Sequence, residues 1–466
     1  MGLLRKSKPY RIKSAEALAA AAVLALVAAG LAGAKAPPPS LVRISTDTTS
    51  TPDAQHATEV EPDAFAVGSK IVATFQVGRF FGGAAGAIGF STSTNAGRTW
   101  TPGLVPGLPG AGAASDPVVA YDALHARWLI ATLVPDVSGQ SALAVSASPD
   151  GFAWEAPVTA VSYPRDPNIG TALDKQWLTC DNGKASPFSG HCYLAYTDVA
   201  HDTDPDHRGS HIGVQGSSDG GRTWSAPVLL PVNADIVSPG VQPVVRPNGE
   251  LVVVFFEDGM AEAVRSNDGG VTFSERELIS SPVFHRRPIT PTRLRVFSLP
   301  TATVDAAGVV YVAWLDCRFR AQCATDDIVW SRSTVPGNWS TVRRVPLGPL
   351  GSRRQFVLPD LAVAGSRLAL TYYAVSTPDC TEATCLLDVY LVTSKTRGAR
   401  WAKPRRLNPV RMRLTWLART VSGRMVGDYM ATVFAGTRVV SVHVQAGPPL
   451  GGRFNEAVYA FSMTLP

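Results

Sequence analysis

Acidic residues recur at one place in the repeating pattern of the chain, at the start of successive strand-like hairpins. They are Glu61, Asp116, Asp174, Asp360 and Asp428. Carboxylates that gather in one place repel one another, which raises the pKa of some of them and would make a polar or ion-binding funnel. Around a ring, these residues would meet at the mouth of a central channel, and Asp174, Glu61 and Asp428 are the best catalytic candidates. The structural alternative is that each carboxylate caps its own strand or pairs with a neighbouring Arg.

Basic residues are expected on the same face. The candidates for ligand binding are Arg79, Arg286, Arg287 and the pair Asp316 and Arg318 beside the Cys317–Cys323 loop. Guanidinium groups recognise carboxylates, sulfates and phosphates through two parallel hydrogen bonds, so this set indicates an anionic ligand. A short disulfide loop would hold Arg318 rigidly, as a preorganised site requires. The alternative is a solvated rim of an Arg-rich protein.

One acidic loop offers a weak candidate for a metal site. Asp202, Asp204 and Asp206 alternate along the chain, and such carboxylates can gather around Ca²⁺. No Gly or distal Glu follows at EF-hand spacing, and Pro205 interrupts the pattern, so a solvated loop is the alternative. We expect no cofactor, with Ca²⁺ as the one candidate ion.

Six copies of a short octet run through the chain and must position these residues. Two are clean, Ser217–Trp224 and Ser266–Phe273; the others are Ser93–Trp100, Ser148–Trp154 and two degenerate copies that end at Trp339 and Trp401. In the octet, Asp can accept hydrogen bonds from the backbone of its own turn. Gly supplies the positive φ of a tight turn, and the final aromatic residue can pack between sheets. The octet therefore predicts a structural turn rather than a catalytic one.

The octet S-x-D-x-G-x-T-W resembles the Asp-box (BNR) repeat of sialidase-like β-propellers. Repeats at a fixed period indicate stacked supersecondary units, so the resemblance implies an all-β propeller of four-stranded blades. Seven hairpins support seven blades: Glu61–Gln76, Asp116–Leu133, Asp174–Thr197, Gln242–Glu257, Thr301–Asp316, Leu358–Tyr373 and Met425–Val444. The last unit has no octet, and we expect Leu41–Thr46 to pair with Ala457–Leu465 and close the ring. Six blades is the alternative.

The catalytic pattern of sialidases is not matched. The place of their F-R-I-P motif, whose Arg binds the substrate carboxylate, has Glu59-Val60-Glu61-Pro62. Arg79 matches the family's Arg after the first hairpin, but the following segment 80–87 lacks the family's acidic residue. Tyr429, beside Asp428, is a stand-in for the Tyr nucleophile of the family. The likeness therefore concerns the fold rather than the reaction.

The ends and the cysteines favour export. Residues 1–34 combine a basic start, an apolar run and an A-x-A site, which is typical of a signal peptide; an uncleaved N-terminal membrane anchor is the alternative. Residues 35–40 form a Pro-rich linker and residues 41–466 a single propeller domain. Three close cysteine pairs predict local disulfides of an oxidising compartment: Cys180 with Cys192, Cys317 with Cys323, and Cys380 with Cys385.

Two functional hypotheses follow. In the first, a secreted or cell-surface monomer binds an extracellular carbohydrate or another anionic ligand on its Arg-rich face, without turnover. In the second, the protein is a glycoside hydrolase that uses the carboxylates of the channel mouth. No Lys/Arg tract interleaved with aromatic residues is present, so a nucleic-acid partner is not expected.

Overall fold

The computed structural model describes residues 1–2, 39–108, 113–135, 140–163, 173–198, 211–231, 237–257, 259–281 and 294–465. From Pro39 onward they belong to one compact unit. They form strands and turns with two short 3-10 helices, η1 (Ala321–Cys323) and η2 (Leu414–Trp416), which confirms the all-β prediction. Within the described ranges, no helix has the length and apolar character needed to cross a membrane. Apart from Met1 and Gly2, the predicted leader lies outside these ranges.

Six consecutive segments each fold into four antiparallel strands paired in chain order. They are β2 (Gln55–Val67), β3 (Lys70–Arg79), β4 (Ala85–Ser93) and β5 (Thr101–Leu104); β6 (Ser115–Asp122), β7 (Arg127–Pro135), β8 (Ser141–Ser148) and β9 (Val158–Tyr163); β10 (Leu173–Cys180), β11 (Cys192–Asp198), β12 (His211–Ser217) and β13 (Val228–Leu229); β14 (Val237–Val245), β15 (Leu251–Glu257), β16 (Met260–Ser266) and β17 (Glu277–Ser280); β18 (Thr301–Val304), β19 (Val310–Asp316), β20 (Asp327–Val335) and β21 (Asn338–Trp339); β23 (Gln355–Ala364), β24 (Arg367–Val375), β25 (Leu386–Ser394) and β26 (Arg405–Arg406). Two short strands add to the last two sheets: β22 (Arg343–Arg344) pairs with β20, and β27 (Met412–Arg413) pairs with β25.

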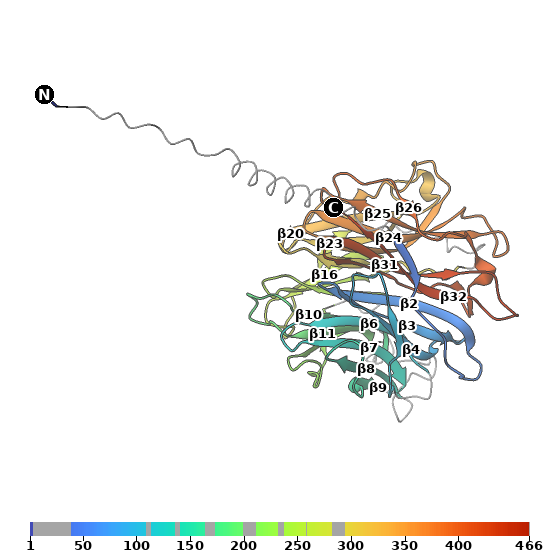
Figure 1. Cartoon of the computed structure of the whole chain (residues 1–466), viewed down its shortest axis with the longest axis horizontal. Coiled ribbons are helices and arrows are strands. Elements are labelled where there is room, and N and C mark those ends of the chain that lie inside the picture. The colour runs from blue at the N-terminus through green and yellow to red at the C-terminus, as the bar shows by residue number, and fades with distance from the viewer. Residues whose placement is uncertain are drawn as a thin grey trace. The chain divides into compact units, whose positions relative to one another are not determined.

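The last segment combines both ends of the compact unit. Its strands are β30 (Ala431–Ala435), β31 (Arg438–Ala446) and β32 (Glu456–Thr464), preceded by a separate hairpin of β28 (Ala418–Thr420) and β29 (Gly423–Met425). The N-terminal strand β1 (Ser40–Arg43) pairs antiparallel with β32, from Ser40 opposite Ser462 to Arg43 opposite Tyr459. The two terminal segments that were expected to pair therefore do so. Figure 1 shows the labelled strands following one another around this unit, with β2 and β32 as neighbours.

Tight glycine turns join the first two strands in three of these segments. In each case two residues separate the paired strand ends, and the first of them is Gly68, Gly365 or Gly436. The φ angles of these glycines are 59°, 61° and 62°. A positive φ at the first central position is the mark of a type II′ hairpin, which matches the twist of the strands. The turns thereby fix the register of the alternating apolar residues.

The hydrophobic core lies between consecutive sheets. One cluster joins Phe90 of β4 to Trp128 and Ile130 of β7, and the other clusters likewise combine two or more sheets. The closing aromatic residue of every octet packs against one of these clusters: Trp100, Trp154, Trp224, Phe273, Trp339 and Trp401. Burial of such large rings is a major stabilising term, so the repeat fastens each sheet to its neighbour.

The octet turns make the hydrogen bonds that their sequence predicts. Asp219 Oδ1 accepts bonds from the backbone N–H groups of Arg222 (2.9 Å) and Thr223 (3.0 Å), and its Oδ2 accepts one from Thr223 Oγ1 (2.6 Å). Asp268 repeats the pattern with the N–H groups of Val271 and Thr272. Asn95 makes the same backbone contacts through its amide oxygen. The acidic group of the octet thus stabilises its own turn.

Three disulfides are present, and they join the predicted pairs Cys180–Cys192, Cys317–Cys323 and Cys380–Cys385. Each closes a local loop at the end of a strand, since Cys180 and Cys192 end and begin β10 and β11, and Cys317 follows β19. Loops of this kind limit the unfolded chain and stabilise the native state. Among the described residues there is no free cysteine.

Candidate functional site

Backbone bulges at the start of the first strands place acidic residues in the interior. The pairing register shifts in β2, β6, β10 and β23, and each shift contains or adjoins a residue with positive φ: Glu61 (53°), Asp116 (51°), Lys175 (47°) and Leu358 (51°). Non-glycine residues adopt this conformation at an energetic cost. A bulge re-aims side chains that regular alternation would send to the other face. As a result, both Glu61 and Asp63 of β2 are buried.

The bulges contribute to a set of charged groups that we call the central cluster: Glu61, Asp116, Asp174, Lys175, Arg295, Asp428 and Tyr429. Glu61 and Asp116 share a hydrogen bond between their carboxyl groups. The amide Nε2 of Gln76 also donates to Glu61, and Ser115 Oγ donates to Asp116 Oδ1 at 2.8 Å. Two carboxyl groups in such contact hold one proton between them, because two anions at this distance repel strongly.

Arg295 neutralises the carboxylate of Asp428. Its Nε donates to Asp428 Oδ1 at 3.0 Å, and its Nη2 donates to Oδ2, so that the pair is bidentate. Burial acts to lower the pKa of Arg295, but the hydrogen bond and charge of Asp428 raise it above the ordinary value. Arg295 is further held by its backbone N–H, which donates to Arg424 O at 2.7 Å. Within the cluster, Asp428 therefore already has a direct ion-pair partner.

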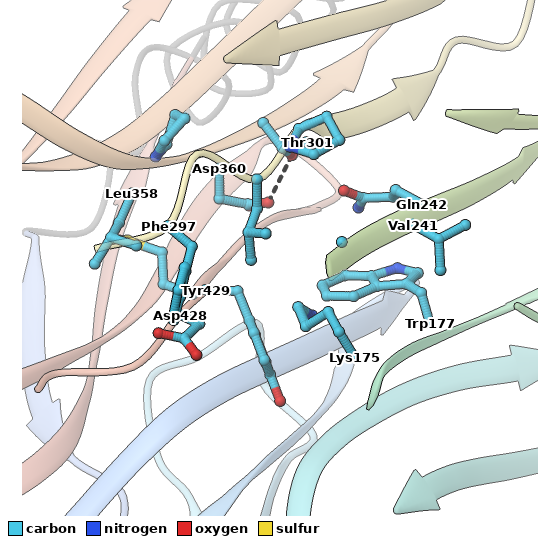
Figure 2. Close-up of a pocket in the computed structure, with 15 residues that line it drawn as sticks. Lys175, Trp177, Val241, Gln242, Phe297, Thr301, Leu358, Asp360, Asp428 and Tyr429 are labelled. Atoms are coloured by element: carbon cyan, nitrogen blue, oxygen red, sulfur yellow. Dashed lines mark hydrogen bonds between the residues drawn. The ribbon is translucent and has the colours of Figure 1, made fainter. Parts of the chain in front are cut away.

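Lys175 is a buried cation between two aromatic rings (Figure 2). Its Nζ lies 4.4 Å from the ring centroid of Trp177 and 3.8 Å from that of Tyr429. Lys175 is 5% exposed, and its Nζ has no hydrogen-bond partner among the described residues. Cation–π contact replaces part of the lost hydration. The hydroxyl of Tyr429 donates to Pro117 O at 3.0 Å, which fixes its ring against β6.

The pKa values of the cluster carboxyls diverge. Burial, followed by the charges of Asp116 and Asp428, raises the pKa of Asp174 to about 7. Burial and the charge of Asp116 also raise the pKa of Glu61 well above its ordinary value. Burial acts to raise the pKa of Asp116 too, but its hydrogen bond with Glu61 and the charge of Lys175 lower it overall. Neighbouring acids whose pKa values move apart are the hallmark of acid and base roles in one site.

Access to the cluster is limited to a few of its members. Glu61, Asp116, Lys175, Asp428 and Tyr429 are buried, whereas Asp174 and Arg295 are half-buried. A cavity of about 20 Å³ lies beside Lys175 and Tyr429, which is room for about one water molecule. Of the acidic members, Asp174 has the largest exposed fraction, whereas Asp428 lines this cavity.

A second, larger cavity of about 750 Å³ lies on the other side of Trp177, Gln242 and Asp360, which line both spaces. Its walls are the later parts of the first strands, and they are mostly apolar, for example Leu361 and Val433. Asp360 ties neighbouring strands together, since its carboxylate accepts a bond from Thr301 Oγ1 at 3.0 Å (Figure 2) and another from the N–H of Thr432. Asp63 similarly accepts the N–H of Val119 at 2.8 Å. Both therefore have structural roles.

The predicted arginine set is only partly described. Arg79 is buried, and its Nη1 donates to Gln76 Oε1 (2.8 Å) and Ala84 O (3.3 Å). Arg318 pairs with Asp316 at 2.6 Å and donates to Ser280 Oγ at 2.7 Å, away from the central cluster. Arg286, Arg287 and the acidic loop with Asp202, Asp204 and Asp206 lie outside the described residues. Within the described ranges, no group of three or more His, Cys, Asp or Glu side chains is arranged to hold a metal ion.

The structure brings together Glu61, Asp174, Asp428 and Tyr429, which the sequence proposed as catalytic candidates. The charges of other cluster members shift the pKa values of Glu61, Asp174 and Tyr429, and Asp428 forms an ion pair with Arg295. Sequence reasoning missed Lys175 and Trp177. The available signal was weak: Lys175 directly follows Asp174, and Trp177 lies two residues beyond it on a strand whose alternation the bulge interrupts.

Comparison with known proteins gives structural likeness at low identity. No protein-family model matches the chain, and no curated protein does. A Dyadobacter fermentans protein of unknown function has a TM-score of 0.48 and 16% identity over 72% of this chain and 94% of its own. A Penicillium chrysogenum α-L-arabinanase has a TM-score of 0.45 and 13% identity over 92% and 99%. A Streptococcus pneumoniae sialidase has a TM-score of 0.41 and 13% identity over 92% and 70%. All three TM-scores are below 0.5, and no conclusion on activity rests on them.

Proposed function

We propose that the described strands form a seven-bladed Asp-box propeller that is exported from the cell. Six segments of four consecutive strands and a seventh set made of β30, β31, β32 and β1 would provide the blades. Contact between the last and first sheets is supported by the pairing of Thr58 with Glu456 and by a core cluster shared by β3 and β31. Three local disulfides support an oxidising compartment.

In this proposal the protein is a glycoside hydrolase that acts on an extracellular carbohydrate at the central cluster. The observation that carries it is the state of two neighbouring carboxyls. Asp174 is half-buried with a pKa of about 7, while the pKa of Asp116 is lowered. A protonated acid beside an ionised carboxylate is the pair that cleavage of a glycosidic bond requires.

The cluster residues take separate roles. Asp174 donates its proton to the glycosidic oxygen as the bond from this oxygen to the sugar carbon breaks, and the ionised Asp116 stabilises the positive charge that develops on the sugar. A water molecule then adds to this carbon and gives a proton back to Asp174. The charge of Lys175 acts to lower the pKa of Asp116, and Arg295 holds Asp428 in a bidentate ion pair. Tyr429 serves as a positioning residue, because burial and the nearby acids raise the pKa of its hydroxyl, which already donates to Pro117. This differs from the nucleophile role that the sialidase likeness implies.

The test is a screen of the purified protein, without residues 1–34, against chromogenic glycosides, followed by Asp174→Asn. Turnover should fall by at least about a hundredfold in this variant, because removal of a general acid costs about 10²–10⁴ in rate. Its melting temperature should stay close to that of the wild type. Asp219→Asn, at an octet turn where Asn95 is the natural equivalent, is the matched control and should keep full activity. Undiminished turnover in Asp174→Asn would remove Asp174 from the mechanism.

Glycan binding without turnover is the second candidate, and one observation favours it. The cavity inside the cluster holds about one water molecule, so a sugar ring cannot enter it in this conformation. Binding would then take place on the outer surface of this face and weaken with salt if arginines dominate it. A glycan array that detects binding in the absence of any hydrolysis, with loss of affinity in Arg286→Ala/Arg287→Ala, would support this candidate. Unchanged affinity in that variant would exclude the pair.

A further inference from the structure

A surface pocket lies beside the central cluster, between the segment after β3 and the β28–β29 hairpin. It has a volume of about 340 Å³ and is lined by Phe81, Glu382, Arg424 and residues 419–423. This lies within the range of small-molecule sites, about 300–1,000 Å³. The hairpin also touches the cluster indirectly, because Arg424 O accepts the backbone N–H of Arg295, which binds Asp428.

Arg419 is held in this pocket with its charged group unpaired. The side-chain amide of Gln55 binds the backbone of Arg419 on both sides, accepting its N–H at 2.8 Å and donating to its carbonyl at 2.7 Å. Across the hairpin, Arg419 pairs with Arg424. Its side chain is exposed, and among the described residues its guanidinium has no hydrogen bond or ion pair. The backbone is therefore fixed while the guanidinium fork remains available to a ligand.

Phe81 provides an aromatic surface under this guanidinium. Its ring is 51% exposed, and the guanidinium carbon of Arg419 lies 5.9 Å from the ring centroid. The planar guanidinium can contact a ring and still bind a carboxylate in its own plane. Together, Phe81 and Arg419 offer an apolar face and a charge to a ligand.

The remaining charges of the pocket favour an anion. Glu382 pairs with Arg424, whose Nε lies 2.6 Å from Glu382 Oε1. Arg424 also donates to Leu417 O at 2.8 Å, so its guanidinium is already bound by groups of the protein. The one carboxylate of the pocket is thus neutralised, and the charge of Arg419 is left in excess. The exposed hydroxyl of Ser422 adds a polar group at the rim.

We infer that this pocket binds a sugar unit that carries a carboxylate or a sulfate. The anionic group would meet the fork of Arg419, and the C–H face of the sugar would lie against Phe81. The inference rests on the proposed function for its saccharide nature, and it places the anionic unit beside the channel mouth rather than inside the closed cluster. Uronic acids and sulfated sugars share the required chemistry, and the test separates them.

The experiment is calorimetric titration of the protein without residues 1–34 with three probes: a galacturonic acid hexamer, a dextran sulfate oligomer and unsulfated dextran. The wild type should bind at least one of the anionic probes and bind unsulfated dextran more weakly. Arg419→Gln should weaken anionic binding by at least about tenfold, because a charge-assisted bidentate contact is lost. Arg419→Lys should weaken it less, and Phe81→Ala should weaken it while the protein stays folded, since Phe81 lies at the surface.

Two controls make the outcome decisive. Arg413→Gln removes an exposed arginine of the preceding segment that does not line the pocket, and it should leave affinity unchanged. Asp174→Asn should bind the probe as the wild type does, so that failure of hydrolysis and failure of this pocket remain distinguishable. Equal affinity in Arg419→Gln, an equal loss in Arg413→Gln, or no binding of either anionic probe would overturn the inference.

Discussion

Aspartates in the octet turns and Asp174 in the central cluster have opposite pKa shifts and different roles. At the octet turns, burial acts to raise the pKa of Asp219, but hydrogen bonds from Thr223 and Ser217 together lower it to about 2. Hydrogen bonds from Thr272 lower the pKa of Asp268 to about 2 as well. In the central cluster, burial and like charges raise the pKa of Asp174 to about 7. An aspartate side chain is thus ionised and stabilises a turn in one region, whereas in the other region it is a proton donor near neutral pH.

The difference comes from what surrounds each carboxylate. The octet supplies backbone N–H groups that point at the anion and leaves it near solvent, so ionisation is stabilised. The bulged strands supply burial and neighbouring acids instead, together with Lys175, whose own pKa is lowered by burial. The hydrogen-bond donors around an acidic residue of a repeat protein therefore indicate whether the residue stabilises a turn or can act as an acid or base. The number of acidic residues does not.

Removal of the buried cation should give the largest effect. Lys175→Met keeps the length of the side chain but leaves Asp116 and its neighbours without their counter-charge, which costs about 3–5 kcal/mol of unfolding free energy. Urea denaturation at pH 8 checks this value, and the loss should be smaller at pH 5, where the carboxyls take up protons. Lys70→Met is the control: Lys70 sits over Phe152 at an octet turn and donates to Asp150 O, and its loss should cost less than about 1 kcal/mol. Equal losses of unfolding free energy in Lys175→Met and Lys70→Met would contradict the difference between the central cluster and the octet turns.

The pH dependence of stability should follow the buried set between pH 4 and 7. The pKa values of Asp63 and Asp174 are raised to about 7 and that of Asp360 to about 6, chiefly by burial, against about 3.9 in the unfolded chain. The folded state then binds more protons than the unfolded state, so stability falls as pH rises through this window. His443, whose pKa burial lowers to about 3, opposes this trend as a single group. Urea midpoints at pH 4.5, 6 and 7.5 measure it, and a steady increase would contradict the assignment of the buried acids.

The octet carboxylates should act in a lower pH range. Because their folded pKa values are near 2, their contribution is present above about pH 4, the unfolded pKa, and is lost as pH falls toward 2. Thermal melts of wild type and Asp219→Ala at pH 3 and pH 6 should differ more at pH 6. If the variant is equally destabilised at both values, hydrogen bonds to the ionised form are not the cause.

Truncation at one octet should have the smallest effects. Asp219→Ala loses the acceptor of two backbone N–H groups and should cost about 1–2 kcal/mol, because each such hydrogen bond contributes about 0.5–1.5 kcal/mol. Asp219→Asn should cost less than half of this, since Asn95 makes the same backbone contacts. Chemical denaturation of both variants checks the order. Equal losses for Asn and Ala would show that charge rather than hydrogen bonding matters at this turn.

The fold was largely predictable because its signals are local. The octets and alternating hairpins specify turns and strands within a few residues, and the pairing of β1 with β32 follows from an octet-less last unit. The cluster was predictable as a set of acids, since Glu61, Asp174 and Asp428 recur at equivalent places. The partner of each acid was not predictable. Bulges with positive φ at Glu61 and Asp116 change the direction of the side chains, and the alternating pattern of a regular strand does not reveal this.

The ion-pair partners of the arginines were equally hard to predict from the sequence. Arg318 was expected to bind a ligand but pairs with Asp316 two residues away, and Arg295 reaches Asp428 across more than a hundred residues. Lys175 was missed because a lysine next to an acid in the sequence is usually solvated. Only burial between Trp177 and Tyr429 gives it a distinct role.

The most direct test is hydrolysis of a glycoside panel by wild type and Asp174→Asn at pH 5.5 and 8.5. With a pKa of about 7 for Asp174, the acid is protonated at the lower pH and ionised at the higher one. We predict turnover by the wild type at pH 5.5, a decrease of at least about tenfold at pH 8.5 and loss of turnover in Asp174→Asn. Absence of hydrolysis by the folded wild type at pH 5.5, or equal turnover by the variant, would contradict the proposed acid role of the central cluster.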